Sequence, residues 1–426
     1  MQNGAKKCIT DADRNREFDV TGPLQGIRVL DLSRILAGPW CTQVLADLGA
    51  EVIKIEKPGA GDDTRHWGPP WLRDAAGNET RESAYYLSSN RGKQSVTIDI
   101  SQPEGRAIIE RLAAQSDVFI ENFKTGDLAR KGLGYEQIRA INPRIIYCSI
   151  TGFGQTGPRA QQAGYDYLVQ GMGGLMSITG IPEGEPGAGP LRVGVAVGDL
   201  STGLYATIGI LAALHHRHAS GEGQHIDLAL LDTVVGMMAN QGQNYFVGGK
   251  VPERTGAEHP NLAPYRTFAT SDGYIIIAVG NDGQFRKLCA VLGMAALADE
   301  ARFVSNADRV RNRKALADLI EARTSTWTMT KLADALSAAD VPSGPINSLD
   351  KVFADPQVKH RELKIDLPHA LGGSVAGIRN PLRLSATPAS YEHAPPVLGQ
   401  HTEEVLTRLA GLSPAEVARL RETKVI

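Results

Sequence analysis

The 426-residue chain is poor in cysteine and shows no long hydrophobic run. No apolar stretch approaches the ~18 residues that suggest a membrane span, and the first twenty residues lack the apolar core of a signal peptide. The cysteines are far apart in the sequence and form no C-x-x-C pair: Cys8, Cys41, Cys148 and Cys289. This spacing argues against a disulfide framework or a zinc site and is typical of a reducing compartment. These absences predict a cytoplasmic protein with no membrane anchor and no metal site.

The chain also lacks an excess of charge of either sign. Its 45 Lys and Arg residues nearly balance 47 Asp and Glu residues, for a formal net charge of −2, and the basic residues are scattered. Such a chain has no global field that attracts nucleic acid or an anionic membrane. We therefore expect a small molecule as the partner.

Strand patterns alternate with helical patterns in the first 150 residues. Apolar strands are expected at 26–32, 50–55, 95–100, 117–121 and 144–150. The alternation favours a Rossmann-like, doubly wound α/β sheet, and the length of the chain favours a second domain. We predict a mobile tail over 1–20, a large α/β domain over 21–244, a smaller α+β domain over 245–350, and a linker and C-terminal segment over 351–426 that returns to the large domain. Within the smaller domain, Ser271-Asp-Gly273 predicts a hairpin turn between two strands.

Several familiar catalytic signatures are absent or incomplete. There is no Walker A loop, no G-x-S-x-G elbow and no H-E-x-x-H helix. Residues 152–157 (GFGQTG) match the dinucleotide pattern G-x-G-x-x-G, but Pro158 and the polar residues after it do not begin a tightly packed helix. We interpret these glycines as a turn that approaches a ligand, with a nicotinamide enzyme as the alternative. His215, His216 and His218 end a helix, where the helix dipole favours them without any metal.

Asp199 has an informative neighbourhood. It follows the small apolar residues of 194–198 (GVAVG) and precedes a helix expected over 200–217. Aspartate is a preferred helix N-cap, so capping is one interpretation. A carboxylate at a helix entrance, where water is scarce, is also a candidate nucleophile. The local sequence leaves both interpretations open.

A set of segments that run in order from about residue 20 to 405 resembles one family, the class III CoA-transferases, also called the CaiB/BaiF or formyl-CoA transferase family. The matching segments are LDLSRILAGP at 30–39, DLGAEVIKIEK at 47–57, PGAGD at 58–62, NRGKQS at 90–95, DVFIENF at 117–123, GLGY at 132–135, SITGFGQTGP at 149–158, AGYD at 163–166, VGD at 197–199 and LGQH at 398–401. The order of the set makes the resemblance specific.

The resemblance implies a Rossmann-like large domain, a small domain and an interlocked homodimer. It also implies a ping-pong reaction in which an aspartate, Asp199 by motif position, attacks an acyl-CoA thioester and forms a mixed anhydride. An aspartyl-CoA thioester follows, which a second carboxylic acid resolves. CoA is then a substrate, and no permanently bound cofactor is implied. The CoA-binding positions carry over to Lys57, Ile98, Asn122, Phe123 and Arg130.

Substrate preference depends on weaker signals. Residues 61–70 (GDDTRHWGPP) resemble the succinyl-CoA:glutarate branch of the family, which implies dicarboxylic acids, with succinyl-CoA as donor and glutarate as the leading acceptor. Arg34, Arg65 and Asp166 are the candidate substrate-binding residues, although each arginine has an ion pair as its alternative role. Transferases that use formate or oxalate, citramalate or itaconate stay alternatives. The glycine-rich lid of the formyl-CoA transferases has no clear counterpart here.

Two other functions compete with acyl transfer. The related acyl-CoA racemases have Gly-His-Asp where this chain has Gly164, Tyr165 and Asp166, and no histidine occurs between His66 and His215. A racemase or isomerase with a histidine base in this region therefore lacks its imidazole. A CoA-binding protein without catalysis is the third hypothesis, and Asp199 argues against it.

Overall fold

The computed structural model describes residues 22–426 and divides them into two compact units. The first contains the described residues up to 175 together with 193–240 and 361–426, and the second contains 176–192 and 241–360. Residues 176–192 thus belong to the second unit, although the sequence placed them in the large domain, and that unit extends ten residues beyond the expected limit at 350. The tail predicted over 1–20, with Cys8, lies outside the described residues.

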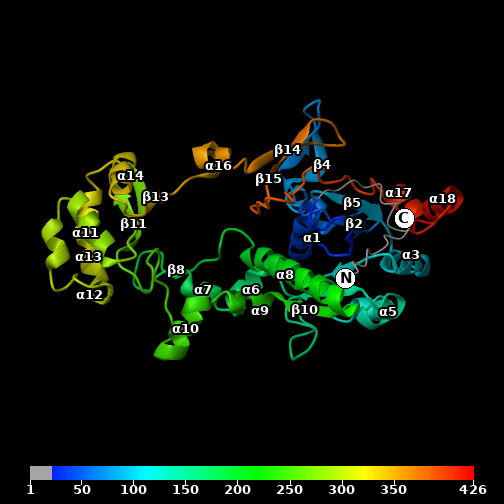
Figure 1. The fold of residues 1–426 in the computed structure, drawn as a ribbon, viewed down its shortest axis with the longest axis horizontal. Helices are drawn as coiled ribbons and strands as arrows, with labels where there is room; N and C mark the ends of the chain where they lie inside the picture. Colours follow the sequence, from blue (N-terminus) through cyan, green and yellow to red (C-terminus); the bar gives the residue numbers. More distant parts are fainter. Residues whose placement is uncertain (1–21) are drawn as a thin grey trace, which may run out of the picture. The chain divides into compact units, whose positions relative to one another are not determined.

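A six-stranded parallel sheet forms the centre of the first unit (Figure 1). Its strands are β1 (Arg28–Asp31), β2 (Glu51–Glu56), β5 (Lys93–Thr97), β6 (Val118–Glu121), β7 (Ile146–Thr151) and β10 (His225–Ala229). Their spatial order is β10-β7-β6-β1-β2-β5, with parallel pairing throughout. The chain starts at β1 in the middle of the sheet and adds β2 and β5 on one side. It then returns and adds β6, β7 and β10 on the other side. The strand order therefore reverses between β1 and β6, where ligands bind in open α/β sheets.

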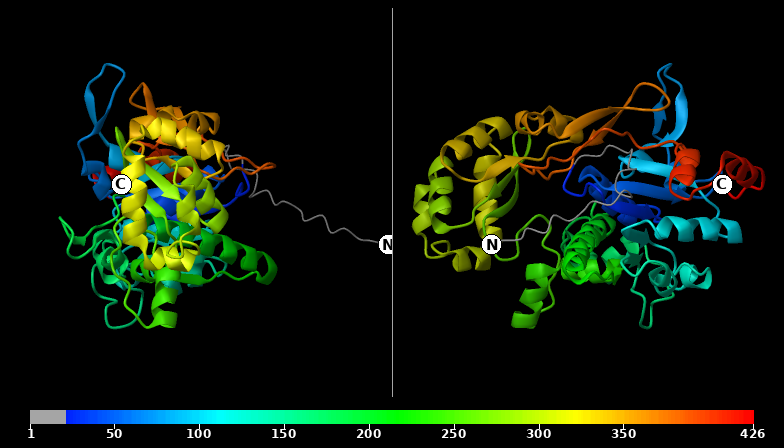
Figure 2. Two further views of the ribbon diagram at one scale, coloured as in Figure 1. Left: turned by 90° about the vertical axis from the view of Figure 1, so that its left-hand side faces the viewer. Right: turned by 45° about the vertical axis from the view of Figure 1, so that its right-hand side comes forward.

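Both faces of this sheet are buried, as parallel sheets require. On β1, Val29 belongs to the core on one face and Leu30 to the core on the other. The first face is covered by α1 (Ala37–Asp47), α8 (Val197–Ser220) and α9 (Leu230–Gly236). The second is covered by α3 (Pro103–Ala113), α5 (Tyr135–Ile141), α17 (Thr402–Arg408) and α18 (Pro414–Glu422). The C-terminal helices thus contribute to the core of the first unit, and Figure 2 shows their ribbons beside the sheet.

The longest helix, α8, packs closely on α1 (Figure 1). Gly203 makes this approach possible, because a Cβ there would lie 2.6 Å from the carbonyl oxygen of Ala37. By length and composition α8 is also apolar enough to cross a membrane, with a mean hydropathy of 1.4 over 18 residues. From the sequence we expected no apolar stretch long enough to span a membrane, so this property of α8 was not predicted. Ala206 and Ile210 of α8 are fully buried in the core on the sheet, whereas Leu204, Tyr205 and Ile208 are 48–60% exposed, so one side of α8 belongs to the core.

Shorter elements of the first unit connect or flank the sheet. They are η2 (Asp63–His66), β3 (Trp71–Arg73), β4 (Glu79–Ser83), α2 (Ala84–Leu87), α4 (Asp127–Arg130), α6 (Asp166–Met172), β14 (Lys364–Pro368) and β15 (Ser374–Ile378). The connection between the units begins in α7 (Leu175–Ile178), and α10 (Ala239–Gly248) leads back into the second unit.

The second unit has a three-stranded antiparallel sheet with helices around it. The strands are β11 (Tyr265–Thr270), β12 (Gly273–Ala278) and β13 (Ser343–Pro345), and a small pair is formed by β8 (Gly180–Ile181) and β9 (Gly189–Pro190). The helices are α11 (Asp282–Val291), η3 (Ala295–Asp299), α12 (Asn306–Arg311), α13 (Arg313–Thr324), α14 (Met329–Ala338), α15 (Leu349–Ala354) and α16 (Pro356–His360). The hairpin predicted at Ser271–Gly273 is confirmed by the antiparallel pairing of β11 with β12.

Candidate active site

Asp199 is the third residue of α8, not its N-cap. The N-cap position is Ala196, which offers no side-chain hydrogen bond. A second carboxylate caps the helix instead: Oδ1 of Asp166 accepts hydrogen bonds from the backbone N–H of Gly198 at 2.7 Å and of Asp199 at 3.3 Å. The other oxygen of Asp166 accepts a hydrogen bond from Gln170 at 2.6 Å. The capping interpretation of Asp199 is therefore wrong, and the capping role belongs to Asp166.

The side chain of Asp199 is partly buried beside this second carboxylate. Burial, followed by the negative charge of Asp166, raises the pKa of Asp199 to about 7. A carboxylate with a raised pKa is a better nucleophile than an ordinary one, because basicity and nucleophilicity rise together. Near neutral pH a large fraction of Asp199 is still ionised. The group is therefore suited to attack a carbonyl carbon.

Asp199 lines a cavity of about 300 Å³, here called the Asp199 cavity. Its walls include Arg34, Ile35, Leu36, Ala37, Asn122, Phe123, Thr151, Gly152, Tyr165 and Leu230. Most of these residues follow the carboxyl ends of β1, β6 and β7. The cavity thus lies at the reversal of strand order, where the fold places a ligand.

A second cavity, here called the Lys57 cavity, has a volume of about 380 Å³. Its walls include Leu32, Lys57, Ala60, Gly61, Ile98, Asp99, Ile100, Ser101 and Lys131. Arg34, Asp63 and Phe123 line both cavities, so the two adjoin at these residues. The guanidinium of Arg34 lies over the ring of Phe123, 5.2 Å from its centroid, and pairs with Asp63 at 3.0 Å. One extended ligand can therefore occupy both cavities past Arg34 and Phe123.

Residues 24–402 match the sequence profile of CoA-transferase family III. The chain belongs to this family. It is 52% identical over 387 residues to the succinate–glutarate CoA-transferase of Agrobacterium fabrum, which covers 91% of this chain and 96% of that protein. It is 43% identical over 404 residues to the succinyl-CoA:glutarate CoA-transferase of Homo sapiens, covering 95% and 90%. A solved CaiB/BaiF family protein from Brucella suis is 50% identical, with a TM-score of 0.81 over 91% of this chain and all of that one.

The resemblance stated from the sequence motifs is thus confirmed, and the chain is an enzyme of the transferase type. Its α/β class and central parallel sheet are confirmed as well. Within residues 22–426 of this CoA-transferase, no three His, Cys, Asp or Glu side chains are grouped so that they can hold a metal ion.

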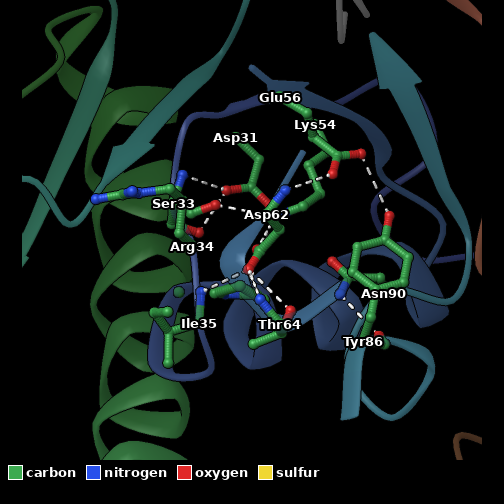
Figure 3. Close-up of polar contacts among 12 residues, drawn as sticks. Asp31, Ser33, Arg34, Ile35, Lys54, Glu56, Asp62, Thr64, Tyr86 and Asn90 are labelled. Carbon is green, nitrogen blue, oxygen red and sulfur yellow. Dashed lines mark hydrogen bonds and ion pairs between the residues drawn. The ribbon is translucent and has the colours of Figure 1, made fainter. Parts of the chain in front are cut away.

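A buried ionic network of the transferase, which includes Lys54, Glu56 and Asp62, forms part of the wall of the Lys57 cavity; Figure 3 shows its polar contacts. The ammonium group of Lys54 donates to Asp62 at 2.9 Å and to the carbonyl oxygen of Ser33 at 2.9 Å. Burial alone lowers the pKa of Lys54, but the charges of Asp62, Asp31 and Glu56 outweigh burial and raise it above its usual value. Burial likewise opposes ionisation of Asp62, yet Lys54 lowers the pKa of that carboxyl to about 2. Both groups are therefore charged at neutral pH.

The structure places most of the predicted site residues of the transferase at the two cavities, and Arg34 and Phe123 line both. Arg34, Asn122 and Phe123 line the Asp199 cavity, and Lys57 and Ile98 line the Lys57 cavity. The amide of Asn122 also connects two loops, because it accepts from the N–H of Arg34 at 2.8 Å and donates to the carbonyl of Arg34 at 2.6 Å. With Asp199, six of the predicted residues thus lie at the adjoining cavities.

Arg65 lines neither cavity, so its role in substrate binding stays a prediction that the geometry does not support. It is 4% exposed and forms ion pairs with Glu56 and Glu82, each at 2.8 Å. Its guanidinium lies 3.7 Å from the centroid of the Tyr86 ring. The ion-pair alternative fits this residue, because two carboxylates and an aromatic ring already contact its guanidinium. Arg130 also lines neither cavity; it is exposed and pairs with Asp127 on its own helix, α4.

Three residues near the site escaped sequence analysis. Lys131, next to the predicted Arg130, is the one that lines the Lys57 cavity. Tyr85 lies near enough to Asp199 to respond to its charge. Burial, followed by the charges of Asp199, Asp166 and Asp62, raises the pKa of Tyr85 to about 12. Only the neighbouring Arg130 offered a signal for Lys131; nothing in the local sequence pointed to Tyr85.

The third, Glu121, ends β6 directly before the Asn122–Phe123 pair. Its carboxylate accepts the N–H of Phe123 at 2.7 Å. Burial raises the pKa of Glu121 to about 7, against hydrogen bonds from Ser149 and Phe123 that lower it. Ser149 is in turn 3.0 Å from the ring of His225. Glu121 therefore supports the loop that separates the two cavities.

Proposed function

We propose that this CoA-transferase moves CoA from succinyl-CoA to a second dicarboxylic acid such as glutarate, with Asp199 as the covalent carrier. The main support is the position of Asp199, whose pKa is near 7, in a cavity that adjoins a second cavity lined by lysines. The relatives named for succinate or succinyl-CoA and glutarate, at 52% and 43% identity, support the choice of acids.

The reaction needs two acyl exchanges on one carboxylate. The Asp199 carboxylate attacks the thioester carbon of succinyl-CoA, so a C–O bond forms, the C–S bond breaks and CoA thiolate leaves. The thiolate then attacks the Asp199 carbonyl of the mixed anhydride and releases succinate. Glutarate attacks the resulting aspartyl thioester, and the returning thiolate attacks the glutaryl carbonyl. Glutaryl-CoA leaves and Asp199 is restored, with no net proton, oxidant or reductant.

Arg34 is the proposed anchor for the remote carboxylate of the diacid. Its side chain is 45% exposed and lies where the two cavities meet. Its partner Asp63 is 53% exposed, so the pair is a solvent-exposed one, and such pairs open at little cost. A substrate carboxylate held by the guanidinium fork would lie in the cavity that Asp199 also lines.

Lys57 and Lys131 are the proposed partners of the CoA phosphates. Both line the Lys57 cavity, and Lys57 follows the carboxyl end of β2. A lysine there suits the 3′-phosphate of CoA, because phosphate binding relies on cations and charge-assisted hydrogen bonds. The thioester end would then extend past Phe123 toward Asp199.

A racemase or isomerase is the competing function, and the site favours it less. No histidine is among the residues that line the Asp199 cavity. The acid nearest to Asp199, Asp166, already accepts from two backbone N–H groups and from Gln170. A two-base proton transfer therefore lacks its second base.

The test is incubation of the protein with succinyl-CoA and a panel of diacids that contains glutarate, oxalate, citramalate and itaconate. New CoA esters are identified by mass, and Asp199→Ala is the matched control. Without acceptor, a peptide that contains Asp199 should gain the mass of CoA less water. Equal rates for both proteins would refute the role of Asp199, and solvent deuterium at the α-carbon of a 2-methylacyl-CoA would indicate a racemase.

The homodimer and the cytoplasmic location stay predictions; light scattering tests the dimer.

A further inference from the structure

Ile35 has an unusual backbone conformation at the edge of the Asp199 cavity. Its φ is 71°, in the left-handed region that a β-branched residue rarely adopts. It lies in the loop between β1 and α1, and its side chain is partly buried in the cavity wall. Such a conformation persists only where surrounding contacts hold it, and it is concentrated at functional sites.

Side chains from other elements bond to the backbone of each residue of this turn; Figure 3 labels Lys54 and Asp62, which bond to Ser33 and Ile35. The carbonyl of Ser33 accepts from Lys54 at 2.9 Å, and both backbone groups of Arg34 bond to the Asn122 amide. The N–H of Ile35 donates to Oδ1 of Asp62 at 3.3 Å. The turn is therefore determined by contacts that are distant in sequence.

Asp62 is the centre of this support. Its Oδ1 also accepts from the N–H of Thr64 at 3.0 Å and from its hydroxyl at 2.8 Å, while Oδ2 pairs with Lys54. The side chains of Asp62 and Lys54 are both fully buried in the wall of the Lys57 cavity, where they pair with each other. Lys54 bonds to one end of the turn and Asp62 to the other, which makes the ion pair a clamp across residues 33–35.

We infer that Asp62, paired with Lys54, is a positioning residue that keeps Ile35 left-handed and thereby sets the distance between Arg34 and Asp199. This inference rests on the proposed function, in which Arg34 holds the remote carboxylate and Asp199 reacts at the other end. The turn then determines which chain length of diacid the transferase prefers. A relaxed turn allows Arg34 to move, and diacids of different length become more nearly equivalent.

Two matched variants separate the backbone from the side chain. Ile35→Gly and Ile35→Ala both remove the branched side chain, but only glycine adopts positive φ without steric cost. We expect Ile35→Gly to have a Tm at least as high as Ile35→Ala. We also expect it to lose about ten-fold in the ratio of kcat/KM for glutarate against adipate, with a smaller loss for Ile35→Ala. An unchanged ratio in folded Ile35→Gly would overturn the inference.

A double-mutant cycle tests whether Asp62 acts through the turn. Asp62→Asn should lower the same ratio in the wild-type background and change it little when Ile35→Gly is already present. Multiplicative effects would overturn the inference. If Asp62→Asn does not fold, Lys54→Met/Asp62→Asn removes both buried charges and takes its place. Thr64→Val is the control, since it removes one hydrogen bond to the same carboxylate oxygen but leaves Ile35 in place.

The two proposals fail in different ways. A wild-type protein that transfers CoA to no diacid would contradict the proposed function. The Tm values of Ile35→Gly and Ile35→Ala would still test whether residue 35 is left-handed in the folded protein. A higher Tm for Ile35→Ala would contradict that conformation and overturn the inference. A wild type that transfers CoA, with variants of unchanged selectivity, would contradict only the positioning role.

Discussion

The carboxylate of Asp166 accepts a hydrogen bond from the backbone N–H of Asp199, at 3.3 Å. The two acids therefore share one helix end but have different tasks. Asp166 satisfies N–H groups in the first turn of α8, and its charge opposes ionisation of the neighbouring acid. Asp199 is thereby left to face the cavity.

Replacement of Asp166 by Asn should shift the pH dependence of transfer to lower pH. Asn keeps an acceptor for the N–H groups but removes the charge, so the pKa of Asp199 falls. Burial is the larger cause, so the shift is partial. The measurement is kcat/KM for succinyl-CoA between pH 5 and 8. Asp166→Ala also loses the cap and should cost about 1 kcal/mol. An unmoved profile in Asp166→Asn would mean that burial alone sets the pKa.

Asp199 should also make folding stability depend on pH. Its pKa rises from an ordinary value of 3.8 to about 7 on folding, so between these values the folded state binds more protons than the unfolded chain. Its contribution is present below about pH 4 and is lost as pH rises through 7. Asp199→Asn, which does not titrate, should therefore be more stable than wild type at pH 8, by up to about 4 kcal/mol, and lose this advantage at pH 4. Thermal unfolding at several pH values measures the difference.

Arg34 and Arg65 form a matched pair for separating function from stability. Arg65→Met leaves Glu56 and Glu82 buried without their cation and should cost about 3–5 kcal/mol. Arg34→Gln should change stability by no more than about 0.5 kcal/mol, yet raise KM for diacids about ten-fold or more while monocarboxylic acceptors respond little. Unfolding by denaturant and steady-state kinetics test both variants. The reverse result would restore Arg65 as a substrate ligand.

Removal of Lys57 or Lys131 should weaken the binding of the CoA phosphates. For Lys57→Met and Lys131→Met we expect KM for succinyl-CoA to rise about ten-fold, because a charge-assisted bond is lost. The informative comparison uses 3′-dephospho succinyl-CoA. The variant of the lysine that contacts the 3′-phosphate should lose no further affinity on this substrate, whereas wild type should. Arg130→Met is the control, because Arg130 lines neither cavity.

The ordered motifs were enough to recognise the family and, through that resemblance, Asp199 as a candidate, while local strand and helix patterns predicted the sheet. For two residues the local sequence left alternative roles open. Asp199 looked like a helix cap because the acid that caps α8 lies 33 residues earlier, on α6. Arg65 looked like a substrate ligand because nothing nearby in the chain shows that it meets Glu56 and Glu82 in the interior.

The sequence by itself determined the family and the alternation of strands and helices that brings the carboxyl ends of β1 and β6 together. Only the tertiary structure decided that Asp166 caps and Asp199 faces the cavity, that Arg34 rather than Arg65 lies at the site, and that Ile35 is held left-handed by Asp62. The reason is physical. Propensity and hydrophobic period act over a few residues, whereas burial, charge pairing and pKa depend on groups that only folding brings into contact.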